Sequence, residues 1–139
     1  MMKKYSALTK YINLLKNDNA GEWICDKEND GSSERPMHLP FVIYSITVKK
    51  LADDIYKFAK ESDEIVPSKY ADILNANGIE WGYDSMMKAD ASGLDAQCIL
   101  ALPIASLRAE RFCDGALLEF IKSGAVTRWL KRLQELDEA

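Results

Sequence analysis

Residues 98–107 read CILALPIASL; the longest apolar run in the chain is 98–105, and it is extended through Ser106 to Leu107. As a helix, this run is apolar on every side, so we expect it to be buried on most sides. The helix is predicted to begin after Ser92 and to end near Phe112. Pro103 removes a backbone donor inside it, which predicts either a kink near Ile99 or two helices that meet at Pro103.

Amphipathic stripes on both sides of this run predict the helices that pack around it, because their apolar residues recur at spacings of three and four. The predicted helices cover about 3–16, 45–62, 68–74, 84–87, 93–112, 116–121 and 125–136. The fold class is therefore mainly α, with about five to seven helices in one compact domain over residues 1–139.

The segment 22–44 interrupts the helical pattern. Residues 26–36 are polar and rich in turn formers, with Asp30-Gly31 as the sharpest turn signal. Residues 39–44 favour a strand, although Pro36 and Pro40 exclude it from the centre of a sheet. We expect a long loop here, with room for one short β-ribbon.

Composition and charge exclude several classes of protein. Hydrophobic residues make up 47% of the 139 residues, too many for a disordered chain. The net charge of −4 is opposite in sign to the surplus that duplex nucleic-acid binders carry, and no apolar run approaches the roughly 20 residues that cross a bilayer. The three cysteines are odd in number and widely spaced, which indicates a cytoplasmic protein without disulfides.

We expect no metal and no cofactor. Three cysteines and a single histidine lack zinc-ligand spacing. The stretch 26–31 places oxygen ligands and a glycine as a calcium loop does, but Met37 stands where the bidentate glutamate belongs. No glycine-rich phosphate loop or nucleophile elbow is present in the sequence.

The densest charged feature beside the core is the stretch 108–115, RAERFCDG. Arg108 and Arg111 share a helix face, and Asp114-Gly115 opens the next helix, whose first amides are free donors. Two guanidinium groups near a helix N-terminus predict a site for phosphate or carboxylate. The alternative is that these residues only stabilise the fold. In that case Asp114 caps the helix predicted over 116–121, and the arginines pair with Glu110, Asp114 or Asp95.

Two loop residues complete the candidate ligand-binding set of Arg108, Arg111, Asp114, Gly115, Trp81 and His38. Trp81, together with Trp23 and Tyr83, can line a pocket or simply cover the core. His38 has a suitable pKa for a general base but no evident partner, so a hydrogen-bonded loop histidine is the simpler interpretation. Cys25 and Cys113 act as nucleophiles only if a base converges on them in space.

The stretch 107–133, LRAERFCDGALLEFIKSGAVTRWLKRL, resembles the ending of a bacterial family of unknown function, numbered 6508. The stretches GEWICDKENDG, LPFVIYS, NGIEWGYDSM and LDAQC are similar to the same family, so the resemblance covers most of the chain. By position, the signature residues are Arg108, Arg111, Phe112, Asp114 and Gly115. The resemblance implies no established activity. Related endings are similar to tails found beside macrodomain-type modules, which bind ADP-ribose.

The leading hypothesis is a cytoplasmic, helical binding or accessory module of unassigned cellular role. Its expected partner is another protein or a small anionic ligand held by Arg108 and Arg111, with no duplex nucleic acid and no membrane. One alternative is an enzyme acting on a phosphate-bearing ligand such as a nucleotide or ADP-ribose, with Glu110, Asp114 or His38 in proton transfer. A second alternative is a homo-oligomer built on an exposed apolar face of the last helix.

Overall fold

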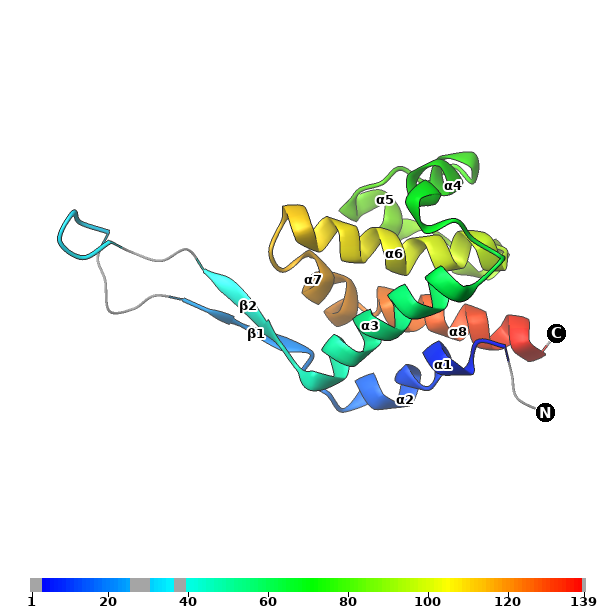
Figure 1. Cartoon of the computed structure of the whole chain (residues 1–139), viewed down its shortest axis with the longest axis horizontal. Helices are drawn as coiled ribbons and strands as arrows, with labels where there is room; N and C mark the ends of the chain where they lie inside the picture. Colours follow the sequence, from blue (N-terminus) through cyan, green and yellow to red (C-terminus); the bar gives the residue numbers. More distant parts are fainter. Residues whose placement is uncertain (1–3, 26–30, 37–39, 139) are drawn as a thin grey trace.

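The computed structural model describes residues 4–25, 31–36 and 40–138, and shows a helical body from which a two-stranded ribbon projects (Figure 1). The predicted class, mainly α with one short β-ribbon, is confirmed. In chain order, the elements are α1 (Ser6–Thr9), α2 (Tyr11–Lys16), β1 (Gly21–Ile24), β2 (Phe41–Tyr44), α3 (Ile46–Glu61), the 3₁₀ turn η1 (Pro67–Lys69), α4 (Tyr70–Ala76), α5 (Tyr83–Lys88), the 3₁₀ turn η2 (Ala91–Gly93), α6 (Ala96–Phe112), α7 (Ala116–Lys122) and α8 (Ala125–Glu138).

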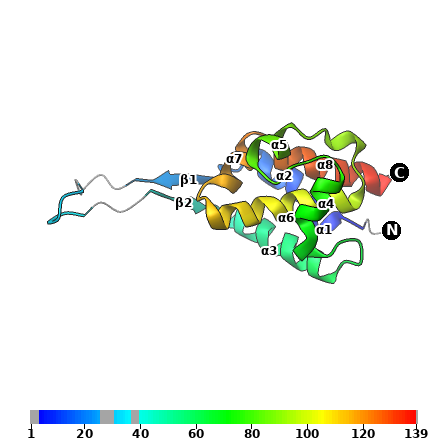
Figure 2. The ribbon, with the colours of Figure 1, turned by 90° about the horizontal axis from the view of Figure 1, so that it is seen from above.

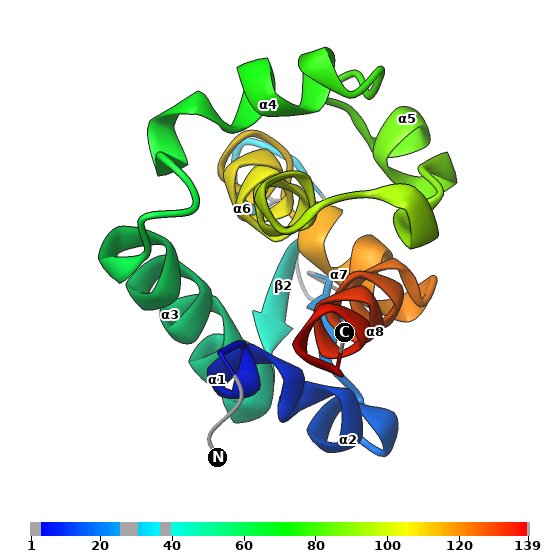
Figure 3. The ribbon, with the colours of Figure 1, turned by 90° about the vertical axis from the view of Figure 1, so that its right-hand side faces the viewer.

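The central helix of the body is α6. Every residue of its apolar run, 98–107, is buried. The helix contacts α3, α4, α7 and α8, which surround it in Figure 3. Its first turn is capped by the Asp95 carboxylate, which accepts from the Cys98 backbone N–H at 2.9 Å. Because α6 continues through Pro103, the alternative of two helices meeting at that residue is wrong. Tertiary packing on several sides stabilises the helix where proline leaves one backbone hydrogen bond unmade.

The helix predicted over residues 3–16 is divided at Lys10 into α1 and α2. The apolar stripe of this segment faces the core, as predicted, since Tyr5, Leu8 and Leu15 are buried. Both short helices contact α3 and α8. A helix of four or six residues has little stability of its own, so these contacts hold the two segments in place.

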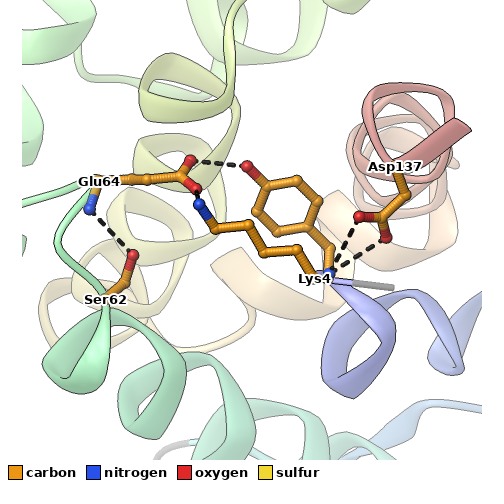
Figure 4. Close-up of polar contacts among 5 residues, drawn as sticks. Lys4, Ser62, Glu64 and Asp137 are labelled. Atoms are coloured by element: carbon orange, nitrogen blue, oxygen red, sulfur yellow. Dashed lines mark hydrogen bonds and ion pairs between the residues drawn. The ribbon is translucent and has the colours of Figure 1, made fainter. Parts of the chain in front are cut away.

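Polar contacts fasten the start of the chain to α8 and to the segment after α3 (Figure 4). The Tyr5 backbone N–H donates to the Asp137 carboxylate at 3.1 Å, and the Tyr5 hydroxyl donates to Glu64 at 2.6 Å. Glu64 also pairs with Lys4. Burial of Glu64 opposes its ionisation, but the hydrogen bonds from Lys4 and Tyr5 outweigh that effect and hold its pKa below the ordinary value.

The ribbon is an antiparallel pair in which Gly21 lies opposite Tyr44 and Ile24 lies opposite Phe41. Side chains alternate between its two faces, so Trp23 and Tyr44 share the face that meets the helical body. Figure 2 shows the ribbon leaving the body at the end where α7 lies. At the base of the ribbon, the Asp18 carboxylate accepts from the Ser45 hydroxyl at 2.6 Å, which ties the start of β1 to the start of α3.

The apolar stripe of α8 faces the core. Val126, Trp129, Leu130 and Leu133 are all buried, and α8 contacts α6 and α7. The homo-oligomer hypothesis required an exposed apolar face on this helix. Among the described residues of α8, this apolar stripe is buried inside the body.

Candidate functional site

The junction between α6 and α7 is built around the carboxylate of Glu110. The side chain accepts from the backbone N–H groups of Gly115 at 3.1 Å and Leu117 at 3.0 Å, and from the Tyr44 hydroxyl at 2.7 Å. The Tyr44 oxygen in turn accepts from the Leu118 N–H at 3.1 Å. A negative charge is favourable at a helix N-terminus, where the first amides have no intrahelical partner.

The first amides of α7, which the sequence suggested as donors to an external anion, therefore bind a carboxylate of the same chain. Glu110, and not Asp114, caps α7, so the structural alternative of an Asp114 cap is also wrong. The same bonds attach the ribbon to the body, because Tyr44 is the last residue of β2. Burial, and then the hydrogen bond to Glu110, raises the pKa of the Tyr44 hydroxyl above its ordinary value.

Gly115 stands at the N-cap of α7 for two independent reasons. Its φ of +92° lies in the left-handed region that favours glycine. A Cβ at this position would lie 2.2 Å from Cζ2 of Trp23, so the indole ring covers the glycine directly. Trp23 belongs to β1, which gives the ribbon a second attachment to the junction.

A cleft of about 420 Å³ opens beside this attachment, and we call it the junction cleft. It is lined by Trp23, Tyr83, Ala109, Cys113, Asp114, Gly115, Ala116, Glu119 and Phe120. Trp23 is 44% exposed and Tyr83 is 43% exposed, so both rings are accessible to a ligand. The Tyr83 ring packs on Phe120 at 5.2 Å between centroids, and Phe120 packs on the buried Trp129 at 5.6 Å. One wall of the cleft is thereby anchored in the core.

The charged residues that line the junction cleft, Asp114 and Glu119, are both acidic and both exposed. With aromatic rings and two carboxylates in its lining, the cleft has the chemistry of a site for a cation that carries an apolar stem. This is opposite in sign to the anion site that the sequence suggested at the same junction.

The structure divides the predicted ligand-binding residues into separate groups. Asp114 and Gly115 line the junction cleft, whereas Arg108 and Arg111 do not. Arg108 is half-buried and Arg111 is exposed, and neither forms an ion pair with any residue that the structure describes. The expected pairing of the arginines with Glu110, Asp114 or Asp95 is therefore wrong. The buried Nε atom of Arg108 has no hydrogen-bond partner among the described residues.

Trp81 is packed against α6 and does not line the junction cleft. Its indole N–H donates to the carbonyl of Ala105 at 3.2 Å, and its ring meets Tyr70 and Phe112 edge-on. Phe112 is 79% exposed. Trp81 therefore does not join the junction cleft, while Trp23 and Tyr83 do. His38 lies outside the described residues.

The cysteine and acidic side chains in the described part of the chain do not form a metal site. Cys25 and Cys113 are exposed, and burial raises the pKa of the Cys98 thiol to about 11. Across residues 4–25, 31–36 and 40–138, no three His, Cys, Asp or Glu side chains converge as metal ligands.

No described helix combines the length and apolar character that crossing a bilayer requires.

Comparison with known proteins gives one match. The protein-family model described as a family of unknown function (DUF6508) matches residues 1–139. No curated protein and no solved structure matches the chain.

Proposed function

Since the chain belongs to DUF6508, a family of unknown function, we propose a function from the geometry of the junction: a binding module that holds a partner protein in the junction cleft. The observation that carries the proposal is the cleft itself, with accessible aromatic rings on two elements and an acidic rim. Its volume of about 420 Å³ lies within the range of sites that take a small molecule or one large side chain.

The lining of the cleft favours an arginine or lysine side chain of the partner as the group that enters. Trp23 and Tyr83 offer ring surfaces for the methylene stem and for cation–π contact, while Asp114 and Glu119 supply opposite charge. An anionic group would meet two carboxylates at the rim. The protein-partner form of the binding hypothesis is therefore better supported at this cleft than the anionic-ligand form.

The position of Glu110 also supports binding over catalysis. The enzyme hypothesis gives Glu110 a role in proton transfer, but its carboxylate already accepts from two backbone N–H groups and a tyrosine hydroxyl. A carboxylate bound by these donors acts as a structural acceptor at the junction of α6 and α7.

The proposal can be tested by NMR titration of the ¹⁵N-labelled protein with N-acetyl-arginine amide. N-acetyl-citrulline amide is the matched control, because it has nearly the same shape and no charge. The indole N–H signal of Trp23 is assigned by its loss in Trp23→Phe. We expect this signal to shift saturably at millimolar arginine amide and much less with the citrulline compound.

The same titration is repeated on Asp114→Asn/Glu119→Gln, with Glu61→Gln as a control on the exposed surface of α3. We expect the double variant to lose most of the response and the control to keep it. Equal responses to the arginine and citrulline compounds, or an unchanged response in the double variant, would refute recognition of a basic side chain in the junction cleft.

A further inference from the structure

A second cleft, of about 440 Å³, lies between α8 and the segment that leads from the end of α5 through η2, and we call it the basic cleft. It is lined by Met87, Lys88, Ala89, Asp90, Ala91, Ser92, Arg128, Lys131, Arg132 and Glu135. η2 contacts α8 directly. The cleft shares no lining residue with the junction cleft.

The basic cleft has a positive surplus in a chain whose net charge is −4. Four of its lining residues are basic and two are acidic, and both acidic residues already have partners. Glu135 pairs with Arg132 at 3.4 Å, and Asp90 accepts from the N–H and hydroxyl of Ser92. Lys88, Arg128 and Lys131 form no ion pair within the described part of the chain. Their charges are therefore available to a ligand.

Two of the guanidinium groups are held in place by backbone carbonyls. Arg128 Nη2 donates to the Met87 carbonyl at 3.1 Å, and Arg132 Nε donates to the Leu94 carbonyl at 2.9 Å. A guanidinium has five N–H donors, so one bond to the backbone fixes its position and leaves others free. Positioning in advance reduces the entropy lost when a ligand binds.

The spacing along α8 explains why these groups come together. Positions 131, 132 and 135 lie three, four and seven residues after position 128, which places all four on one face of the helix. The apolar stripe of α8 is buried in the core, so this polar face meets the 87–92 segment at the surface of the body.

We propose that the basic cleft binds the phosphate groups of a small phosphorylated ligand. Planar guanidinium groups match phosphate oxygens in pairs, and several nearby cations favour a ligand with more than one negative charge. The lining residues include no aromatic ring on which a base could stack, so the phosphates are the recognised part. The volume suits a small molecule.

The experiment uses inorganic pyrophosphate as the probe, in isothermal titration calorimetry at fixed ionic strength with the whole chain. Arg128→Gln and Lys131→Gln each remove one charge from exposed side chains, so both variants are expected to fold. Arg111→Gln is the matched control, because it also removes one exposed arginine charge. Arg111 lies at the junction of α6 and α7, where the sequence analysis predicted an anion site, and it does not line the basic cleft. Thermal unfolding of each variant verifies that it is folded.

We expect saturable binding that weakens about tenfold or more in Arg128→Gln and in Lys131→Gln and stays within about twofold in Arg111→Gln. Absence of binding, or equal weakening in all three variants, would overturn the proposal. A second arm uses a twelve-residue oligothymidylate. Tighter binding of this oligonucleotide than of pyrophosphate, with a loss in Arg111→Gln as well, would also overturn it in favour of a nucleic-acid backbone spread over the surface.

Discussion

Replacing Glu110 by alanine is the sharpest test of how the junction is held together. The change removes the acceptor for two backbone N–H groups and for the Tyr44 hydroxyl. Loss of a helix cap costs about 1 kcal/mol, and loss of a hydrogen bond to a charged group costs about 1.5–3 kcal/mol. We therefore expect the free energy of unfolding to fall by about 2.5–4 kcal/mol. This is a large part of the roughly 5–15 kcal/mol typical of a domain.

The assay is urea denaturation followed by circular dichroism, with equal m-values for both proteins as the condition for comparison. Glu110→Gln retains one acceptor oxygen and is expected to lose only about 1–2 kcal/mol. Glu119→Ala removes a carboxylate from the exposed side of α7 and is expected to stay within about 0.5 kcal/mol of the natural protein. A loss below about 1 kcal/mol in Glu110→Ala would refute the assignment of this carboxylate as the cap that joins ribbon, α6 and α7.

The energy of the contact between Tyr44 and Glu110 can be measured by comparing Tyr44→Phe, Glu110→Ala and the double variant that carries both substitutions. Residues in direct hydrogen-bond contact are not additive, and we expect a coupling energy of about 1–2 kcal/mol. The raised pKa of Tyr44 adds a pH signature. Its stabilisation is fully present below the ordinary tyrosine pKa near 10 and is lost as the pH rises through the higher pKa of the folded state. Tyr44→Phe should lose stability more slowly above pH 10, and an identical alkaline profile would contradict this.

Three further outcomes follow from the structure. Gly115→Ala combines a positive φ with a steric overlap and should lower the free energy of unfolding by about 3 kcal/mol. Gly78→Ala has a positive φ in open space and should lower it by about 1 kcal/mol. Equal losses of both variants in urea denaturation would exclude the overlap. A neighbouring serine hydroxyl holds the pKa of Asp18 below its ordinary value, so its stabilisation is present above about pH 4 and lost below; Asp18→Asn should flatten the acid side of a stability–pH curve. Cys113 should react with a thiol reagent in the native protein while buried Cys98, with a pKa of about 11, reacts only on unfolding; mass spectrometry of labelled peptides would reveal the opposite order.

The helical framework was accessible from the sequence because its signals are local. Val48, Leu51 and Ile55 recur at helical spacing and are buried in α3, and the apolar run 98–107 is buried in α6. The break at Lys10 was not predicted, since the stripe continues through it and only packing against α3 and α8 decides where the helix is interrupted.

The site was less accessible because its contacts join distant parts of the chain. Glu110 and Tyr44 are 66 residues apart, and no local sequence pattern indicates that they form a hydrogen bond. The Asp114-Gly115 pair correctly marked the start of a helix, but the carboxylate that caps it comes from the preceding helix. The sequence analysis did not identify the basic cleft, because the basic residues of α8 form a site only together with the 87–92 segment that lies against them.

The hydrogen bond from Tyr5 to Asp137 spans 132 positions in the chain, and α1 lies against α8, the last helix. A covalent crosslink between the segments that carry Tyr5 and Asp137 would therefore demand little rearrangement of the body. Removing the freedom of the open unfolded chain over a loop of this length is worth on the order of 4–5 kcal/mol in the chain-entropy relation. A chain crosslinked between these two segments should therefore unfold at a higher temperature than the natural chain.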